Sequence, residues 1–170
     1  MPHVFAYGSN MNLSDLKRWA HAGGHGDMHI NSVEVGTLTN YELAWNYYSD
    51  VRKGGAANVM EKAGATVYGV LLDVDAQTLG LIDIKEGHPD RYTRWPSPLP
   101  IIRHRDGVRI NAWVYQVTEA YRQTASVPPR PEYLQLVIDA AHHFQFPESV
   151  LRSLTNTVTR LAQRDYSAPE

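Results

Sequence analysis

The sequence predicts an α+β domain in which helices surround a mixed, strongly curved, barrel-like β-sheet. Strand-like apolar segments dominate the first two thirds of the chain, and helix-like segments follow the proline-rich stretch at residues 127–131. Prolines also recur at every second position from Pro96 to Pro100, so the N–H groups that they lack fall along one strand edge. The opposite edge can still pair, and residues 92–102 are therefore expected to border an opening in the sheet.

The first elements follow from local signals. Residues 3–7 form a short apolar and aromatic strand that stops at Gly8-Ser9-Asn10. Asn12 or Ser14 is expected to cap a helix that reaches Ala20. Residues 21–29 are rich in glycine and predict a loop.

Strands and helices then follow in quick succession. Strands are expected at residues 32–38, 42–48, 56–60 and 65–73, with residues 61–64 as the hairpin connection between the last two. Asp106-Gly107 predicts a second hairpin, because both residues tolerate positive φ, and its strands are residues 101–104 and 108–117. Helices are expected at residues 76–85, closed by Gly87, and at residues 132–144 and 147–157.

Length and composition limit the classes of protein. A chain of 170 residues predicts a single domain over residues 1–170. The formal net charge of −2 lacks the cationic surface that nucleic acids bind, and the absence of cysteine excludes disulfides, thiolate nucleophiles and Cys-ligated zinc. No secretory signal and no apolar run of about 20 residues is present. We therefore expect a cytoplasmic protein with neither a nucleic-acid nor a membrane partner.

The segment Phe5-Ala6-Tyr7-Gly8-Ser9-Asn10-Met11 is the first candidate for a functional site. A strand, a tight glycine turn and a helix expose backbone N–H groups without partners, which can bind a carboxylate or a phosphate. The alternative is a plain strand-to-helix turn in which Ser9 or Asn10 caps the helix, and spacing alone favours that alternative.

The segment Ile82-Asp83-Ile84-Lys85-Glu86-Gly87 is the second candidate, because it places Glu86 at a helix C-terminus. The helix dipole and the apolar neighbours both favour a neutral carboxyl there, a property that suits a general base near neutral pH. The alternative is an exposed glutamate in the last turn before a glycine cap, which is a common arrangement.

Tyrosines and histidines give weaker signals. Tyr92, Tyr115 and Tyr133 could line a small polar pocket, although packing is the default role of any single tyrosine. Glycines interrupt the histidines at positions 21–29, and no His-Glu-x-x-His pattern occurs. We therefore expect no metal site.

Taken together, the motifs resemble the γ-glutamylcyclotransferase family over roughly residues 4–156. The pair Tyr-Gly-Ser-Asn and Asp-x-x-Glu-Gly carries most of the resemblance. The matching segments follow in the family's order: Phe5-Ala6-Tyr7-Gly8-Ser9-Asn10-Met11, Lys53-Gly54-Gly55-Ala56-Ala57-Asn58-Val59, Val67-Tyr68-Gly69-Val70, Ile82-Asp83-Ile84-Lys85-Glu86-Gly87 and Pro128-Pro129-Arg130-Pro131-Glu132-Tyr133.

The resemblance implies a mixed β-barrel with helices and an enzyme that needs no cofactor. Its substrate would be a small γ-glutamyl amino acid or amine, which is cyclised to 5-oxoproline with release of the free amine. By position, Glu86 would be the catalytic acid/base, and the substrate-binding residues would be Tyr7, Gly8, Ser9, Asn10, Tyr115 and Tyr133. A homodimer is compatible with the sequence.

Two other interpretations stay open. Ser9 could be a nucleophile, but Gly-x-Ser-x-Gly is absent and no particular His and Asp can be assigned to it. The same fold could also serve as a non-catalytic carboxylate- or peptide-binding module, an interpretation that the presence of Glu86 argues against. The sequence does not identify the leaving amine.

Overall fold

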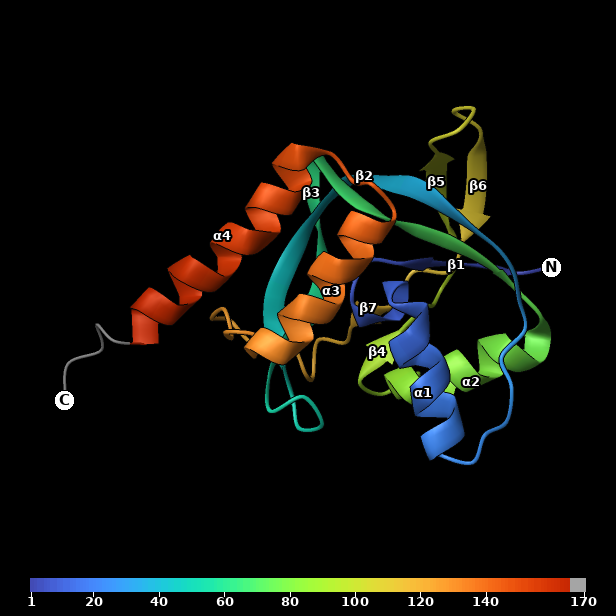
Figure 1. Cartoon of the computed structure of the whole chain (residues 1–170), viewed down its shortest axis with the longest axis horizontal. Helices are drawn as coiled ribbons and strands as arrows, with labels where there is room; N and C mark the ends of the chain where they lie inside the picture. The colour runs from blue at the N-terminus through green and yellow to red at the C-terminus, as the bar shows by residue number, and fades with distance from the viewer. Residues whose placement is uncertain (166–170) are drawn as a thin grey trace.

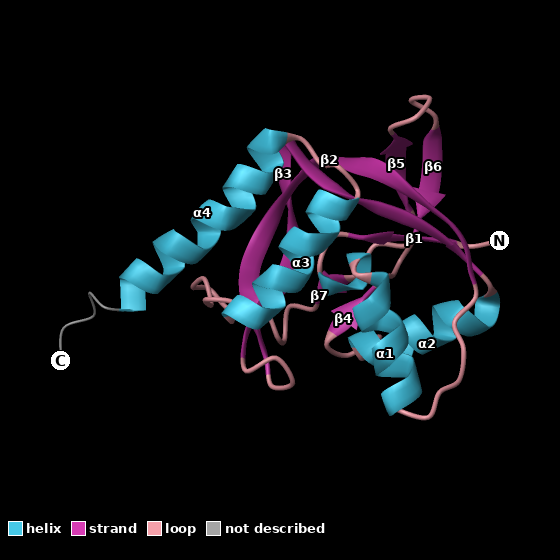
Figure 2. Cartoon of the chain, in the orientation of Figure 1, coloured by secondary structure: helices cyan, strands magenta, loops and turns pink. Residues whose placement is uncertain are grey.

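Two long antiparallel strands, β2 (Ile30–Ser49) and β3 (Gly54–Val74), form the centre of the fold (Figures 1 and 2). The structure is a computed structural model that describes residues 1–165. The other elements, in chain order, are β1 (His3–Ala6), η1 (Ser9–Met11), α1 (Leu13–Ala22), α2 (Ala76–Glu86), β4 (Tyr92–Thr93), β5 (Leu99–Arg103), β6 (Arg109–Ala112), β7 (Gln116–Val117), α3 (Pro131–His143) and α4 (Glu148–Asp165).

The main sheet has the strand order β1-β3-β2-β5-β6, and β4 pairs with β7 in a small second sheet. The α+β class with a mixed sheet is therefore confirmed, but the barrel is not. The edge strands β1 and β6 form no ladder with each other. One parallel bridge, Val4 to Trp113, joins β1 to the chain just beyond β6, where the Phe5 amide donates to the Trp113 carbonyl at 2.9 Å. Because β6 ends at Ala112, the pairing stops after this bridge and the sheet stays open.

The prediction of a hairpin turn at residues 61–64 is wrong, because these residues lie inside β3. The register shifts here, because Tyr41 pairs with Glu61 but Thr39 pairs with Thr66. Residues 62–65 of β3 therefore bulge opposite the single residue Asn40, which has a φ of 62° and whose side chain accepts a hydrogen bond from the Gly64 amide at 3.1 Å. Lys62 and Glu42 pair across the two strands at 2.7 Å. Polar residues that resemble a turn thus form an exposed bulge within one long strand.

The helix boundaries follow their caps. Asn12 caps α1 by accepting from the Asp15 amide at 3.1 Å, and α1 extends to Ala22 rather than ending at Ala20. Asp75 caps α2 in the same way, and Gly87 ends α2 in the left-handed conformation with a φ of 67°. Glu86 is therefore the last residue of its helix, as the sequence predicts. The helices α3 and α4 also form, and α4 continues beyond residue 157 to Asp165.

The second hairpin is confirmed at Gly107, which has a φ of 71°, but the expected strand over residues 108–117 divides into β6 and β7. Within the described chain, β5 pairs with β2 only through Ile102 and Arg103. The proline-bearing part of this segment thus keeps one edge outside the ladder, as the proline spacing predicts.

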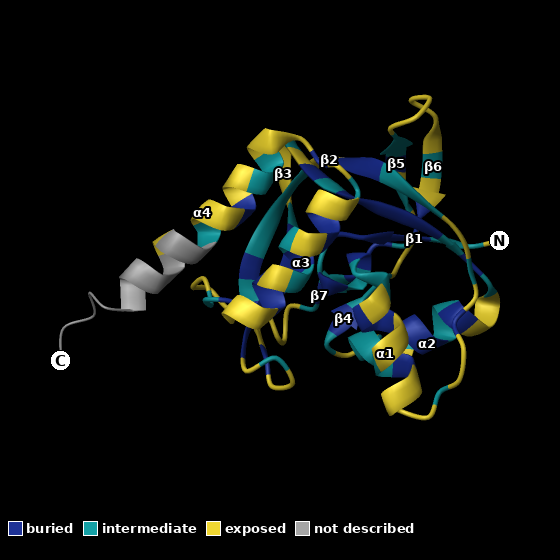
Figure 3. Cartoon of the chain, in the orientation of Figure 1, coloured by how far each residue is buried: buried dark blue, intermediate teal, exposed yellow. Residues whose placement is uncertain are grey.

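The hydrophobic core lies between the sheet and the inner faces of the helices, and Figure 3 colours parts of both as buried. Phe5, Leu72, Ile82 and Leu134 come from β1, β3, α2 and α3 and are at most 1% exposed. Burying such side chains contributes about 1.5–3 kcal/mol each. The core thereby fixes β1 and the C-terminus of α2 relative to each other. Within residues 1–165, no helix combines the length and the apolar character that a membrane span requires.

Candidate active site

A small cavity of about 40 Å³, here called the inner chamber, lies where β1, β3, α2 and α3 meet. The structure brings every site residue predicted from the sequence to its wall. Its lining residues are Val4, Phe5, Ala6, Tyr7, Gly8, Ser9, Asn10, Ala57, Glu86, Tyr92, Tyr115 and Tyr133.

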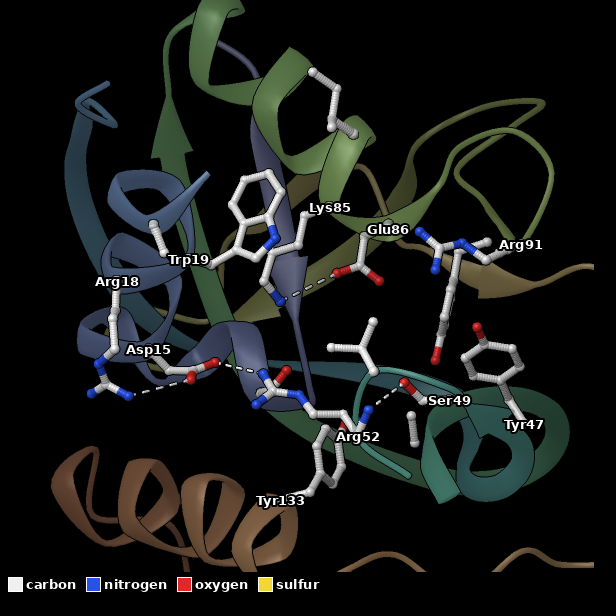
Figure 4. Close-up of a pocket in the computed structure, with 16 residues that line it drawn as sticks. Asp15, Arg18, Trp19, Tyr47, Ser49, Arg52, Lys85, Glu86, Arg91 and Tyr133 are labelled. Carbon is white, nitrogen blue, oxygen red and sulfur yellow. Dashed lines mark hydrogen bonds and ion pairs between the residues drawn. The ribbon is translucent and has the colours of Figure 1, made fainter. Parts of the chain in front are cut away.

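A larger cavity of about 360 Å³, here called the outer cavity, adjoins the inner chamber. The two share the wall residues Ser9, Glu86, Tyr92 and Tyr133. The remaining residues of the outer cavity come mainly from α1, from the end of α2 and from the connection between β2 and β3 (Figure 4). Glu86 therefore stands at the boundary between a narrow compartment and a wide one.

Asn10 holds the Glu86 carboxylate in place. The Asn10 amide nitrogen donates to Glu86 Oε1 at 2.8 Å, and the Asn10 amide oxygen accepts from Lys85 Nζ at 2.8 Å. Lys85 Nζ also lies 4.0 Å from Glu86 Oε1 (Figure 4). Burial lowers the pKa of Lys85, and the charge of Glu86 opposes this effect. The amide and the ammonium together fix the position of the carboxylate.

Tyr133 connects α3 to the glycine turn. Its hydroxyl accepts a hydrogen bond from the Ala57 amide at 3.1 Å, and a Cβ atom added to Gly8 would lie 3.0 Å from the same oxygen. Burial raises the pKa of Tyr133, so this hydroxyl stays protonated at neutral pH and can donate to a ligand. Only glycine fits at position 8 without displacing its neighbours.

Two further tyrosines at the inner chamber, Tyr92 and Tyr7, have buried hydroxyl groups. The Tyr92 hydroxyl donates to the Ala57 carbonyl at 2.8 Å, and the Tyr7 hydroxyl donates to the Tyr115 carbonyl. Burial raises the pKa of both tyrosines well above the usual value. The sequence analysis noted Tyr92 but did not include it among the site residues, because its spacing from Glu86 does not reveal where its side chain points.

Asp83 fixes Tyr115 from outside the chamber. It accepts from the Tyr115 hydroxyl at 2.6 Å and from the Arg94 guanidinium at 2.8 and 2.9 Å. Burial raises the pKa of Asp83, but the hydrogen bonds from Arg94 and Tyr115 outweigh burial, and the net result is a lowered pKa. Asp83 stands in the same sequence motif as Glu86, yet the sequence analysis assigned it no role.

Arg52 and Asp15 form an ion pair at 2.7 Å on the wall of the outer cavity, and the Arg52 guanidinium lies 5.6 Å from the centre of the Tyr133 ring. Sequence reasoning missed both residues. Among the side chains that the structure describes, no group of three His, Asp or Glu residues has the spacing of a metal site.

Comparison with known proteins identifies the family. The family model described as gamma-glutamyl cyclotransferase, AIG2-like, matches residues 4–135. No curated protein sequence matches the chain.

Several solved structures share the fold. One named gamma-glutamyl cyclotransferase has a TM-score of 0.72 at 22% identity, covering 91% of this chain and 86% of its own. The yeast gamma-glutamyl cyclotransferase specific to glutathione has a TM-score of 0.65 at 13% identity, covering 94% and 96%. YkqA from Bacillus subtilis has a TM-score of 0.74 at 20% identity, covering 93% of this chain and 54% of its own. At these identities the likeness shows the fold alone.

The family match covers most of the chain and includes the glycine turn, the end of α2 and Tyr133. Its residues supply the entire lining of the inner chamber. The chain therefore belongs to the AIG2-like gamma-glutamyl cyclotransferase family.

Proposed function

We propose that this protein is a γ-glutamylcyclotransferase that converts the γ-glutamyl group of a γ-glutamyl amino acid or amine to 5-oxoproline and releases the free amine. Family membership supports the proposal. The observation that carries it is the position of Glu86, which Asn10 holds at 2.8 Å on the boundary between the inner chamber and the outer cavity.

Glu86 acts as the acid/base in the proposed reaction. The α-ammonium of the substrate loses a proton to the carboxylate, and the resulting amine attacks its own γ-carbonyl carbon. A carbon–nitrogen bond forms within the new five-membered ring, and the bond from that carbon to the leaving nitrogen breaks. The protonated Glu86 then gives its proton to the leaving nitrogen, and the ring nitrogen passes its own extra proton to the released amine, which departs as an ammonium. Because the nucleophile and the electrophile belong to one molecule, no cofactor is required.

The inner chamber binds the γ-glutamyl group in this proposal. Backbone N–H groups in the turn at residues 7–10 bind its α-carboxylate, since the first N–H groups of a helical turn have no partner within it. Gly8 allows the substrate to approach this backbone closely. Holding the substrate in a ring-forming pose is the main catalytic contribution, because well-oriented intramolecular reactions reach effective molarities of about 10⁵–10⁸ M.

Glu86→Gln tests the proposal. The variant keeps the shape of the side chain but cannot take up a proton, so turnover is expected to fall by about 10²–10⁴-fold. The measurement is 5-oxoproline release from a panel of γ-glutamyl compounds, followed by mass spectrometry. Glu119→Gln is the matched control, because Glu119 is exposed and lines neither chamber.

Near-normal turnover by a folded Glu86→Gln protein would refute the acid/base role. Binding of γ-glutamyl compounds without any 5-oxoproline release by the unaltered protein would favour the non-catalytic binding module instead. Calorimetry on the same panel separates that outcome from a failure to bind.

A further inference from the structure

The outer cavity carries an excess of positive charge. Its wall contains the cationic side chains Arg18, Arg52, Lys85 and Arg91 but only two carboxylates, Asp15 and Glu86. In a site partly shielded from water, uncompensated cations attract an anionic ligand. The excess positive charge therefore favours a negative charge on the part of the substrate that occupies this cavity.

The two carboxylates already have partners. Asp15 lies 2.7 Å from Arg52 and 3.8 Å from Arg18, and Glu86 accepts from Asn10. Among the side chains that the structure describes, no carboxylate lies within 4.0 Å of Arg91. Arg91 is thus the guanidinium on this wall whose charge no protein carboxylate neutralises directly.

Lys85 can also donate further hydrogen bonds. Its side chain is only 9% exposed, and its recorded hydrogen bond goes to the Asn10 oxygen at 2.8 Å, with Glu86 farther away at 4.0 Å. An ammonium group has three donors. A ligand anion in the outer cavity could satisfy the remaining ones.

Arg91 is fixed in place by its backbone and by its neighbours. Its amide donates to the Gly87 carbonyl at 3.0 Å, and its carbonyl accepts from the Thr118 amide at 2.9 Å. The guanidinium packs over Gly87, where a Cβ atom would overlap it. Burial raises the pKa of Tyr47, and the nearby Arg91 guanidinium opposes this effect, which places Arg91 beside the Tyr47 hydroxyl. In Figure 4, Lys85 and Arg91 lie on opposite sides of Glu86.

We propose that Arg91 binds a carboxylate on the leaving group, so that the enzyme prefers γ-glutamyl amino acids or peptides to γ-glutamyl amines. A guanidinium matches a carboxylate with two parallel hydrogen bonds, and a cationic leaving group would instead meet like charges. This inference rests on the proposed function, because it specifies the leaving amine of that reaction.

Two substrates that differ only in the carboxylate provide the test. γ-Glutamylalanine releases alanine, and γ-glutamylethylamine releases the same skeleton without its carboxylate. The ratio of their kcat/KM values is expected to be about 10 or more, since hydrogen bonds between charged groups are the strong ones. In Arg91→Gln this ratio is expected to fall to about one to three. Lys17→Gln, which removes an exposed charge outside the cavity, is expected to leave the ratio unchanged.

The possible failures are distinguishable. If no γ-glutamyl compound yields 5-oxoproline, the proposed function itself fails. If both substrates react but the ratio does not exceed one, or if Arg91→Gln keeps the full ratio, the carboxylate contact is wrong and the proposed function stands. Comparing γ-glutamylglycine with γ-glutamylglycinamide repeats the test in the unaltered protein. Faster turnover of the free acid is expected there, and equal or slower turnover overturns the inference even if the variant does not fold.

Discussion

Ser9 lines both cavities, and its hydroxyl could be taken for a nucleophile. The described residues of the two cavity walls include no histidine that could activate it. Ser9→Ala is therefore expected to keep much of the activity, because the variant retains the backbone N–H groups of the turn. The measurement is 5-oxoproline release by Ser9→Ala, compared with release by Glu86→Gln. A Ser9→Ala protein as inactive as Glu86→Gln, or inactivation by a serine-directed acylating reagent, would support the nucleophile interpretation.

Gly8→Val tests the space at the glycine turn. A Cβ atom at Gly8 would already lie 3.0 Å from the Tyr133 hydroxyl and 3.2 Å from the Ala57 Cβ, and valine adds two methyl groups. Loss of substrate binding and of detectable turnover is expected, as measured by calorimetry and by product release.

Gly80→Ala is the matched control for that variant. Gly80 lies within α2, and a Cβ atom there meets nothing within 4 Å. Gly80→Ala is expected to remain active and to gain about 0.5–1 kcal/mol in unfolding free energy, because alanine favours a helix interior. Full activity in Gly8→Val would show that the turn does not approach the substrate.

At the scale of elements, the C-terminus of α2 is attached on two sides. Asp83 connects it to Arg94 and Tyr115, and Lys85 and Glu86 connect it to Asn10 beyond β1. The helix end therefore links Glu86, the proposed acid/base, to the wall of the inner chamber.

Asp83→Asn tests that attachment through pH. The lowered pKa of Asp83 means that its charged form stabilises the fold at pH values above the unfolded pKa of about 4, and that this stabilisation is lost as pH falls through the lower folded pKa. Asp83→Asn is thus expected to lower the melting temperature by a few degrees at pH 7, and the difference should shrink below about pH 4. Thermal melts between pH 2 and pH 7 measure this.

The exposed residue Asp90, which lines neither cavity, supplies a control as Asp90→Asn, and no change is expected there. A difference for Asp83→Asn that stays constant with pH would show that the charge of Asp83 contributes nothing to stability.

Local signals predict the helix ends but not the extent of the long strands. Asn12, Asp75 and Gly87 act within a few residues of themselves, so their effect is visible in the sequence. β3 continues past residues 61–64 because its pairing with β2 resumes at Thr66 after the bulge, which the contact from Gly64 to Asn40 holds against β2. A contact between strands leaves no local pattern, and the polar residues alone resemble a turn.

The site residues also divide into those that local sequence motifs predict and those that depend on distant contacts. The glycine turn, Glu86 and Tyr133 stand in recognisable motifs, and the structure places them around one chamber. The roles of Arg52 and Lys85 depend on partners 37 and 75 positions away, Asp15 and Asn10. Only the folded chain shows that these charges meet beside Glu86.

At the scale of the whole molecule, different elements line the two adjoining cavities. β1 and the glycine turn that follows it supply most of the inner chamber, while α1 and the connection between β2 and β3 extend over the outer cavity. The inner chamber, at about 40 Å³, is much the narrower of the two, and the outer cavity has about 360 Å³. In the proposed reaction, variation among leaving groups is therefore easier to accommodate than variation in the γ-glutamyl group.

The position of Tyr133 has a consequence for biosynthesis. The ribosome makes the glycine turn and Ala57 early in synthesis. The hydroxyl that binds the Ala57 amide belongs to Tyr133, which follows Ala57 by 76 positions and lies on a helix that starts at Pro131. A nascent chain that has not yet reached α3 can contain every strand of both sheets and still lack one wall of the chamber. A premature stop codon anywhere upstream of Tyr133 therefore yields a product with an incomplete chamber.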